Sequence, residues 1–147
     1  MDLSKTPEPI RVLLVEDEFL IREWIAQALT EQGFAVKTAG NATEALHQIA
    51  CGPVDILLTD INLPGPMDGA VLARRMRELK PDLPVIYASA RATLLEQGAR
   101  VPGSLLLPKP YDLATLVRLL LAALRGGRRA IPTPAPAAAS AAALEPA

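Results

Sequence analysis

Short apolar runs alternate along the chain with longer segments in which apolar residues recur at helical spacing. The short runs are rich in branched aliphatic residues and end at polar or turn-forming residues, which is typical of buried strands. They predict five strands, at residues 10–15, 34–38, 54–59, 83–88 and 105–107. The amphipathic segments predict helices at residues 19–31, 42–50, 68–80, 92–98 and 113–125.

This regular alternation of strand and helix implies a parallel sheet with helices on both faces. Five strands within 147 residues fit an α/β, flavodoxin-like, doubly wound fold with the strand order 2-1-3-4-5. The segment 91–104 is short and contains Gly98, Pro102 and Gly103. We therefore expect a short or irregular fourth helix.

Capping residues and apolar stripes define the helices further. Asn41 is the expected N-cap of the second helix, with Glu44 completing a capping-box pattern, and Asp112 is expected to cap the last helix. The predicted core stripes are Ile21, Trp24, Ile25, Ala28 and Leu29 in the first helix, and Leu113, Leu116, Val117, Leu120 and Leu124 in the last. The last helix offers a surface for a homodimer at Leu119, Ala122 and Ala123, which are expected to lie partly outside its core stripe.

Composition divides the chain into three segments: a flexible N-terminus (1–8), a folded domain (9–125) and a disordered, Ala/Pro-rich tail (126–147). The tail holds four prolines and few large apolar residues, so it cannot bury enough surface to offset its ordering entropy. The chain shows neither a signal-peptide pattern nor the ~20 apolar residues of a membrane span. We therefore expect a soluble, cytoplasmic protein without a membrane partner.

The charge and the cysteine content argue against a nucleic-acid-binding protein and against a disulfide-bonded one. The formal net charge is -1, which argues against a nucleic-acid partner, because such proteins usually carry a basic face. Cys51 is the single cysteine, so no intrachain disulfide can form, and we expect it at a small buried or turn position. His47 is expected to be structural or solvated, without metal-spaced neighbours.

Residues that carry chemistry follow four of the predicted strands. Because carboxyl ends of parallel strands meet at one edge, these side chains should converge near the topological switch point. Crowded carboxylates repel one another unless a cation balances them, and hard oxygen ligands suit Mg²⁺ or Mn²⁺. A lysine and a hydroxyl would bind phosphoryl oxygens. The residues are Glu16, Asp17 and Glu18 after the first strand, Asp60 after the third, Ser89 after the fourth and Lys109 after the fifth.

Taken singly, each residue has a simpler explanation. Acids at a helix start interact favourably with the helix dipole. Asp60 could form a turn, and Lys109 could be a solvated loop residue. Only their combination at one sheet edge favours a site for phosphoryl transfer, which requires mainly positioning and charge neutralisation.

In four segments the chain resembles the receiver domains of bacterial two-component response regulators. The segments are VLLVEDE (12–18), LLTDINLPGPMDG (57–69), PVIYASA (84–90) and LPKPYD (107–112), and the resemblance spans roughly residues 8–125. It implies that Asp60 is the phosphoacceptor and that Glu16 and Asp17 hold Mg²⁺. It also implies that the backbone carbonyl of Asn62 completes the metal site.

The resemblance further implies that Ser89 responds to the phosphoryl group and that Lys109 pairs with it. The family usually has an aromatic residue three positions before the lysine, where this chain has Leu106. The usual hydroxyl–aromatic switch is therefore not expected in its ordinary form. Tyr87 or Tyr111 is a candidate substitute, although Tyr87 is more simply a packing residue of its strand.

By the same resemblance, the phosphodonor is a histidine kinase, a histidine phosphotransfer protein or a small molecule. Arg22 and Glu23 should lie on the outer side of the first helix, where family members meet their donor. Asn62 and Arg91 should tune phosphoryl hydrolysis. We expect a stand-alone receiver that acts on an unknown downstream protein by contact, and is not an enzyme beyond its own phosphorylation and dephosphorylation.

Three alternatives remain open at this stage. A phosphate sink or shuttle for a kinase would use the same residues. A Mg²⁺-dependent aspartyl-phosphate phosphohydrolase would favour an acid two residues after Asp60, where the chain has Asn62. A binder of a flavin phosphate would favour small residues with free backbone N–H groups rather than an acidic crevice.

Overall fold

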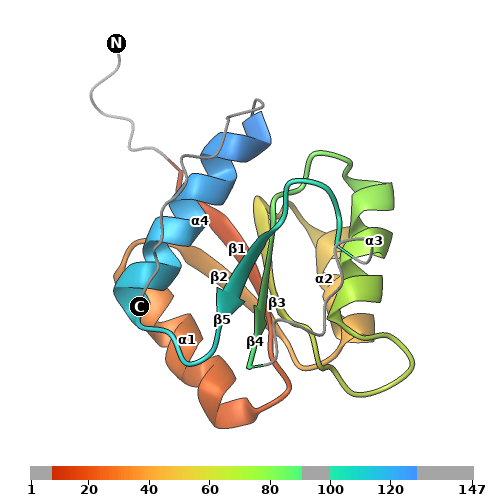
Figure 1. Cartoon of the computed structure of the whole chain (residues 1–147), viewed down its shortest axis with the longest axis horizontal. Helices are drawn as coiled ribbons and strands as arrows, with labels where there is room; N and C mark the ends of the chain where they lie inside the picture. Colours follow the sequence, from red (N-terminus) through yellow and green to blue (C-terminus); the bar gives the residue numbers. More distant parts are fainter. Residues whose placement is uncertain (1–7, 91–99, 129–147) are drawn as a thin grey trace.

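The computed structural model describes residues 8–90 and 100–128, which form alternating strands and helices (Figure 1). The elements are β1 (Arg11–Val15), α1 (Phe19–Glu31), β2 (Ala35–Ala39), α2 (Ala42–Cys51), β3 (Ile56–Asp60), α3 (Gly69–Leu79), β4 (Val85–Ser89), β5 (Leu105–Pro108) and α4 (Leu113–Arg128). The predicted helix at 92–98 lies outside the described residues, as do residues 1–7 and 129–147 of the predicted flexible ends.

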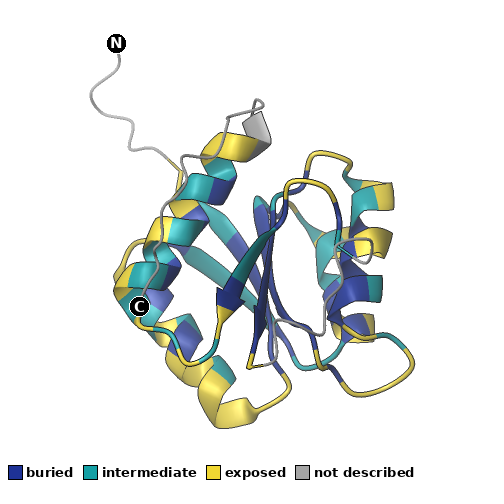
Figure 2. Ribbon diagram, in the orientation of Figure 1, coloured by how far each residue is buried: buried dark blue, intermediate teal, exposed yellow. Residues whose placement is uncertain are grey.

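The five strands form one parallel sheet in the order β2-β1-β3-β4-β5, which confirms the predicted fold class. Helices α1 and α4 cover one face, and α2 and α3 cover the other (Figure 1). Leu13 and Leu57 point into the core on the α2–α3 face, whereas Leu14 and Leu58 point into the core under α1 and α4. Burial on both faces explains the unbroken apolar runs of the central strands (Figure 2).

Side-chain caps begin three of the helices. The Asn41 side chain accepts a hydrogen bond from the backbone N–H of Glu44, at 2.8 Å. The Glu44 carboxylate accepts one from the N–H of Gly40, one residue before the position of an ideal capping box. Asp68 caps α3, accepting from the backbone N–H of Val71 at 2.9 Å, and Asp112 caps α4, accepting from that of Thr115 at 2.8 Å.

The predicted core stripe of α1 is partly wrong. Ile25 and Leu29 are buried, but Ile21 is 38% exposed and Trp24 is 58% exposed. Phe19 and Leu20 in the first turn are also exposed. The start of α1 extends past the carboxyl edge of the sheet, so its first turn has no sheet surface to pack on (Figures 1 and 2).

Helix α4 runs to Arg128, three residues beyond the predicted end at Arg125. Leu116 and Leu120 anchor it in the core, and Ala123, expected partly outside the stripe, is buried beside them. Within the described residues, no helix has the length and hydropathy needed to span a bilayer.

Candidate functional site

The chemistry-bearing residues come together at the carboxyl edge of the sheet. Asp60 is the last residue of β3 and Ser89 the last of β4, whereas Glu16 and Lys109 each follow a strand directly. Parallel pairing of β1, β3, β4 and β5 brings these strand ends to the same edge. The fold therefore produces the convergence that the sequence pattern predicts.

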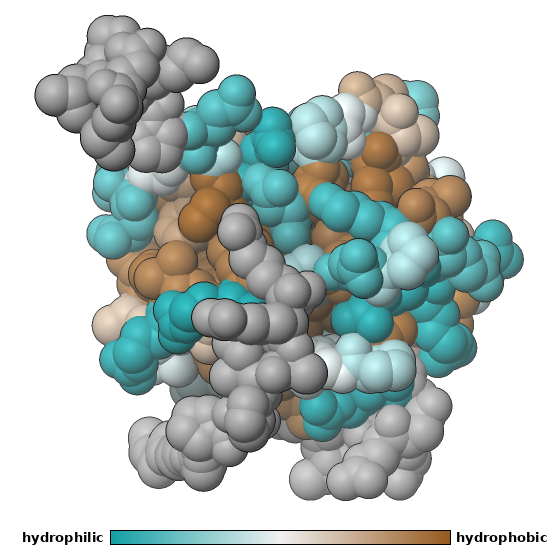
Figure 3. All heavy atoms as spheres, turned by 90° about the horizontal axis from the view of Figure 1, so that it is seen from above, coloured by the Kyte–Doolittle hydropathy of each residue, from teal (hydrophilic) through white to brown (hydrophobic). Residues whose placement is uncertain are grey.

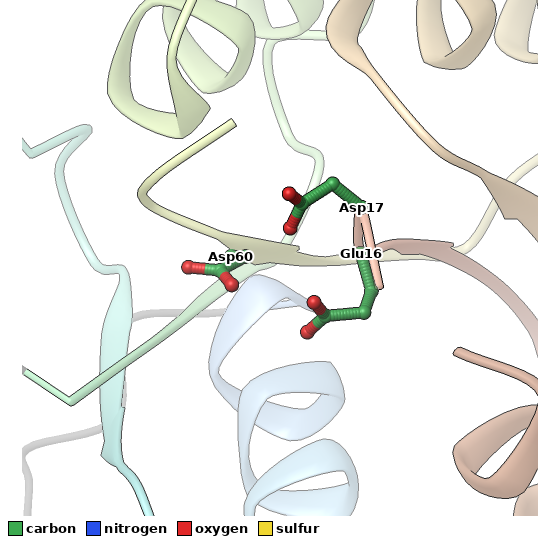
Figure 4. A group of neighbouring side chains, drawn as sticks. All are labelled: Glu16, Asp17 and Asp60. Carbon is green, nitrogen blue, oxygen red and sulfur yellow. The ribbon is translucent and has the colours of Figure 1, made fainter. Parts of the chain in front are cut away.

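Three carboxylates face one space at this edge (Figure 4). One carboxylate oxygen from each of Glu16, Asp17 and Asp60 lies within 4.8 Å of the others. Glu16 and Asp60 are buried, whereas Asp17 is exposed. Three like charges at this spacing repel one another, so the arrangement suits a bound cation.

Lys109 partly balances these charges. Its Nζ donates to Asp60 Oδ2 at 2.9 Å and to Glu16 Oε1 at 3.2 Å. One ammonium cannot neutralise three carboxylates, so the site keeps negative charge in which a divalent cation would be stabilised. The donors are all hard oxygens, which fits a hard cation such as Mg²⁺.

The site shifts the pKa values of its own groups. Burial raises the pKa of the Glu16 carboxyl, although the Glu18 N–H and the Lys109 ammonium oppose this shift. Burial alone would lower the pKa of Lys109, but its contacts with Asp60 and Glu16 outweigh it and raise that pKa. Lys109 therefore stays protonated and remains a cation able to bind phosphoryl oxygens.

The loop after β3 fixes the orientation of Asp60. The backbone N–H of Asn62 donates to Asp60 Oδ1 at 3.0 Å, and Thr59 Oγ1 donates to the Asp60 carbonyl at 2.9 Å. With Lys109 on Oδ2, both carboxylate oxygens have a partner. Asn62 itself is exposed, and its backbone N–H lies beside the Asp60 carboxylate in a loop that solvent reaches.

Gly69 is a positioning residue that the sequence analysis did not single out. Its N–H donates to the Ile61 carbonyl at 2.7 Å, which draws the start of α3 against the end of β3. A Cβ atom here would lie 2.1 Å from the Asp60 carbonyl oxygen, so only glycine allows this approach. The sequence signal was the Asp-Gly pair at the start of a predicted helix.

Arg22 was assigned to the outer side of α1, and this prediction is wrong. The residue is half-buried, and its Nη1 donates to the carbonyl of Glu16 at 2.8 Å. Its guanidinium also lies over the Phe19 ring, 5.4 Å from the centroid. Arg22 therefore holds the β1–α1 loop that carries Glu16 and Asp17, while Glu23 is exposed as expected.

The remaining predicted residues have separate positions. Ser89 is buried at the end of β4, and its carbonyl accepts from the N–H of Lys109 at 2.9 Å. Leu106 pairs in register with Tyr87, a fully buried residue whose hydroxyl accepts from the N–H of Val101 at 3.1 Å. Tyr87 is thus a packing residue, as expected, and Arg91 lies outside the described residues.

Tyr111 is the tyrosine on which the charged groups of the site act. It is half-buried against the core under α1 and α4. Burial raises its pKa to about 12, and the charges of Lys109, Glu16 and Asp60 act on it as well. Its hydroxyl therefore stays neutral at physiological pH.

Comparison with known proteins identifies this arrangement. The family model of the response regulator receiver domain matches residues 12–121. The chain belongs to this family. A transcriptional regulator from Azospirillum brasilense, DNA-binding NtrC, is 34% identical over 128 residues, which is 86% of this chain but 26% of NtrC. This receiver domain thus spans about a quarter of that relative's length.

Solved receiver structures agree with the fold. The response regulator receiver protein from Sinorhizobium medicae WSM419 superposes with a TM-score of 0.76 at 31% identity, covering 82% of this chain and 98% of the other. The response regulator TrrA from Thermotoga maritima, in complex with Mg²⁺–BeF, gives a TM-score of 0.67 at 29% identity, covering 78% and 98%.

Proposed function

We propose that this receiver domain is a phosphorylation-dependent switch that accepts a phosphoryl group on Asp60. The observation that carries the proposal is the pairing of Asp60 with Lys109 at 2.9 Å beside two further carboxylates. Family membership supports it, since receiver domains are the phosphoacceptor modules of two-component systems. The roles of the individual residues are inferred from this geometry.

The transfer itself requires little covalent chemistry from the protein. A carboxylate oxygen of Asp60 attacks phosphorus, the new O–P bond forms, and the bond from phosphorus to the donor breaks. When the donor is a phosphohistidine, the imidazole keeps the electron pair and takes up a proton. The product is an acyl phosphate on Asp60, and catalysis consists of positioning and charge neutralisation.

Glu16, Asp17 and Asp60 would hold Mg²⁺, with the Asn62 carbonyl completing the set. The bound ion would neutralise charge on the phosphoryl oxygens. The TrrA complex with Mg²⁺–BeF supports this assignment by similarity. Glu16 is oriented for the role by the Glu18 N–H, at 3.2 Å, and Asp17 reaches the shared space from the exposed side.

Lys109 and Ser89 would respond to the new phosphoryl group. Phosphorylation adds about −1.5 to −2 charges and new acceptor oxygens to Asp60. Lys109 would leave the carboxylates for these oxygens, and the Ser89 hydroxyl would donate to another. The backbone hydrogen bond between Ser89 and Lys109 couples the ends of β4 and β5, so both would respond together.

Receiver domains interact with histidine kinases or phosphotransfer proteins, and we propose that this one meets its donor at the start of α1. Phe19, Leu20 and Trp24 form an exposed apolar surface, termed here the α1 surface. It begins two residues after Asp17, so a donor docked on it would lie beside the acid cluster. We further propose that the signal leaves through contacts with other proteins, including self-association through α4.

Intact-mass measurement tests the acceptor. The protein is incubated with Mg²⁺ and a small-molecule phosphodonor, alongside Asp60→Asn and the matched control Glu18→Gln. We expect one phosphoryl group on the wild type and on Glu18→Gln, whose exposed side chain is outside the acid cluster. Equal labelling of Asp60→Asn would overturn the assignment.

A further inference from the structure

His47 and Cys51 lie together on an exposed face of α2, one helical turn apart. Both residues are exposed, and the Cys51 Sγ lies 3.6 Å from the His47 Nε2. The chain contains one histidine and one cysteine, and these two metal-ligating side chains are neighbours. The expectation that His47 lacks a metal-spaced neighbour is therefore wrong, because the fourth residue along a helix returns to the same face.

The spacing of the two atoms matches that of a tetrahedral metal site. Bonds of about 2.0–2.1 Å from zinc to nitrogen and about 2.3 Å to sulfur, at a tetrahedral angle, separate the two ligand atoms by about 3.5–3.6 Å. The observed 3.6 Å is a direct hydrogen-bond contact between Sγ and Nε2, and it equals this separation, so a metal ion would take the place of the shared proton without a shift of α2. Two ligands four residues apart on a helix are also the arrangement by which paired histidines bind zinc.

We propose that His47 and Cys51 form a bidentate site for Zn²⁺ or a similar tetrahedral divalent cation. The thiol would release its proton to solvent on binding, and the imidazole would bind through the lone pair of Nε2. Water would fill the two remaining positions of the metal. Affinity falls on acidification, because both ligands must be deprotonated to bind.

This site is separate from the phosphoacceptor site in place and in chemistry. Helix α2 starts at Ala42 beside the carboxyl edge of the sheet and runs back, so Cys51 lies towards the opposite edge. Hydrophilic and hydrophobic residues are mixed on the surface at that edge (Figure 3). Nitrogen and sulfur ligands select zinc-like ions, whereas the oxygen ligands around Asp60 select magnesium. The inference does not depend on the proposed function.

Cobalt is the appropriate probe, because thiolate bound to Co²⁺ gives a charge-transfer absorption that carboxylate ligands do not give. The full-length chain without a histidine tag is titrated with Co²⁺ under reducing conditions, in excess Mg²⁺ to occupy the carboxylates. Since Cys51 is the single cysteine, this absorption reports its coordination alone. We expect the absorption to saturate at one Co²⁺ per chain, and Zn²⁺ to displace it.

Three variants test whether Cys51 and His47 are the ligands of Co²⁺. Cys51→Ser should abolish the absorption, and His47→Gln should weaken Co²⁺ binding roughly 100-fold, since the second ligand then no longer acts intramolecularly. The double variant Thr43→His with His47→Gln keeps one imidazole on α2 but places it about 12 Å from Cys51 along the axis. It should bind as weakly as His47→Gln.

Two results would overturn the proposal. One is the lack of a thiolate charge-transfer absorption in the wild type. The other is equal Co²⁺ affinity in the wild type and His47→Gln, which would mean that Cys51 binds the metal without His47. Circular dichroism of each variant confirms that α2 and the fold are intact.

Discussion

At the residue scale, Gly69 restricts the position of the loop that follows the phosphoacceptor residue Asp60. Gly69→Ala forces the new Cβ against the Asp60 carbonyl oxygen, so the β3–α3 loop must move. We expect a loss of about 1–3 kcal/mol in the free energy of unfolding, as for other overpacked positions. The rate of Asp60 phosphorylation should fall as well. Urea unfolding and intact-mass time courses measure the two effects.

Gly126→Ala is the matched control, because a Cβ at Gly126 meets no atom within 4 Å. It should leave the phosphorylation rate unchanged. A Gly69→Ala protein with wild-type stability and rate would show that the loop adapts freely and that Gly69 does not position Asp60.

Asp17 tests the acid cluster as a metal site. Mg²⁺ at about 100 times its Kd should add about 2.7 kcal/mol to the free energy of unfolding of the wild type. Asp17→Asn should lose this gain, and its metal-free form should be at least as stable as the wild type, because one of three repelling charges is removed. Thermal unfolding with and without Mg²⁺ measures both. A Mg²⁺ gain of wild-type size in the variant would contradict the assignment.

Sequence reasoning succeeded for residues placed by topology and failed for residues placed by packing. Glu16, Asp60 and Lys109 could be grouped because each comes at the carboxyl end of a parallel strand. The roles of Arg22 and Gly69 were not predicted, since they depend on one hydrogen bond to a backbone carbonyl and one close approach of two segments of the chain. Such contacts leave no periodic signal.

At the element scale, Arg11 of β1 and Asp55, which precedes β3, are hydrogen-bonded at the amino edge of the sheet. The Asp55 carboxylate accepts from the backbone N–H of Arg11 at 2.8 Å and from its Nε at 3.2 Å. Burial would raise the pKa of Asp55, but these hydrogen bonds outweigh it and hold the pKa below its ordinary value of 3.8. The charged form therefore stabilises the start of β1 next to β3.

The stability contribution of Asp55 is fully present above pH 3.8 and is lost as the pH falls through the lower folded pKa. Asp55→Asn should cost about 1 kcal/mol at pH 7 and progressively less below about pH 4. Glu8→Gln, which removes the exposed 3.4 Å ion pair with the same arginine, is the control and should cost little. A pH-independent cost for Asp55→Asn would contradict this reading.

The order of strands and helices could be predicted from the sequence, but some predicted ends of the strands were wrong. Val54 and Leu83 are buried, yet both precede the strands to which they were assigned. Apolar character reports burial, whereas strand ends are set by the hydrogen-bonded ladder. For the same reason Trp24 fitted the stripe of α1 although no sheet lies beneath it.

At the scale of the whole molecule, the α1 surface and the acid cluster lie at the same end of the fold. Trp24→Gln should slow phosphotransfer from a histidine kinase or phosphotransfer domain by about tenfold, which corresponds to 1.4 kcal/mol. Labelling by a small-molecule donor should be unchanged, because that donor needs no docking surface. Time courses of phosphotransfer, quenched at fixed times, compare the two donors.

Leu79→Gln is the matched control for this surface. Leu79 is 65% exposed at the end of α3, at the opposite edge of the sheet, so a donor at Asp60 does not reach it. Equal slowing by Leu79→Gln and Trp24→Gln would show that general surface polarity, rather than docking at α1, sets the rate.

The most direct test of the central claim locates the phosphoryl group on the chain. Borohydride reduces an acyl phosphate to an alcohol, so the phosphorylated aspartate becomes homoserine and can be found by peptide mapping. After phosphorylation with Mg²⁺ present, we predict homoserine at position 60, with Glu16 and Asp17 unmodified. Reduction at either of those acids, or at no carboxylate of the site, would contradict Asp60 as the phosphoacceptor.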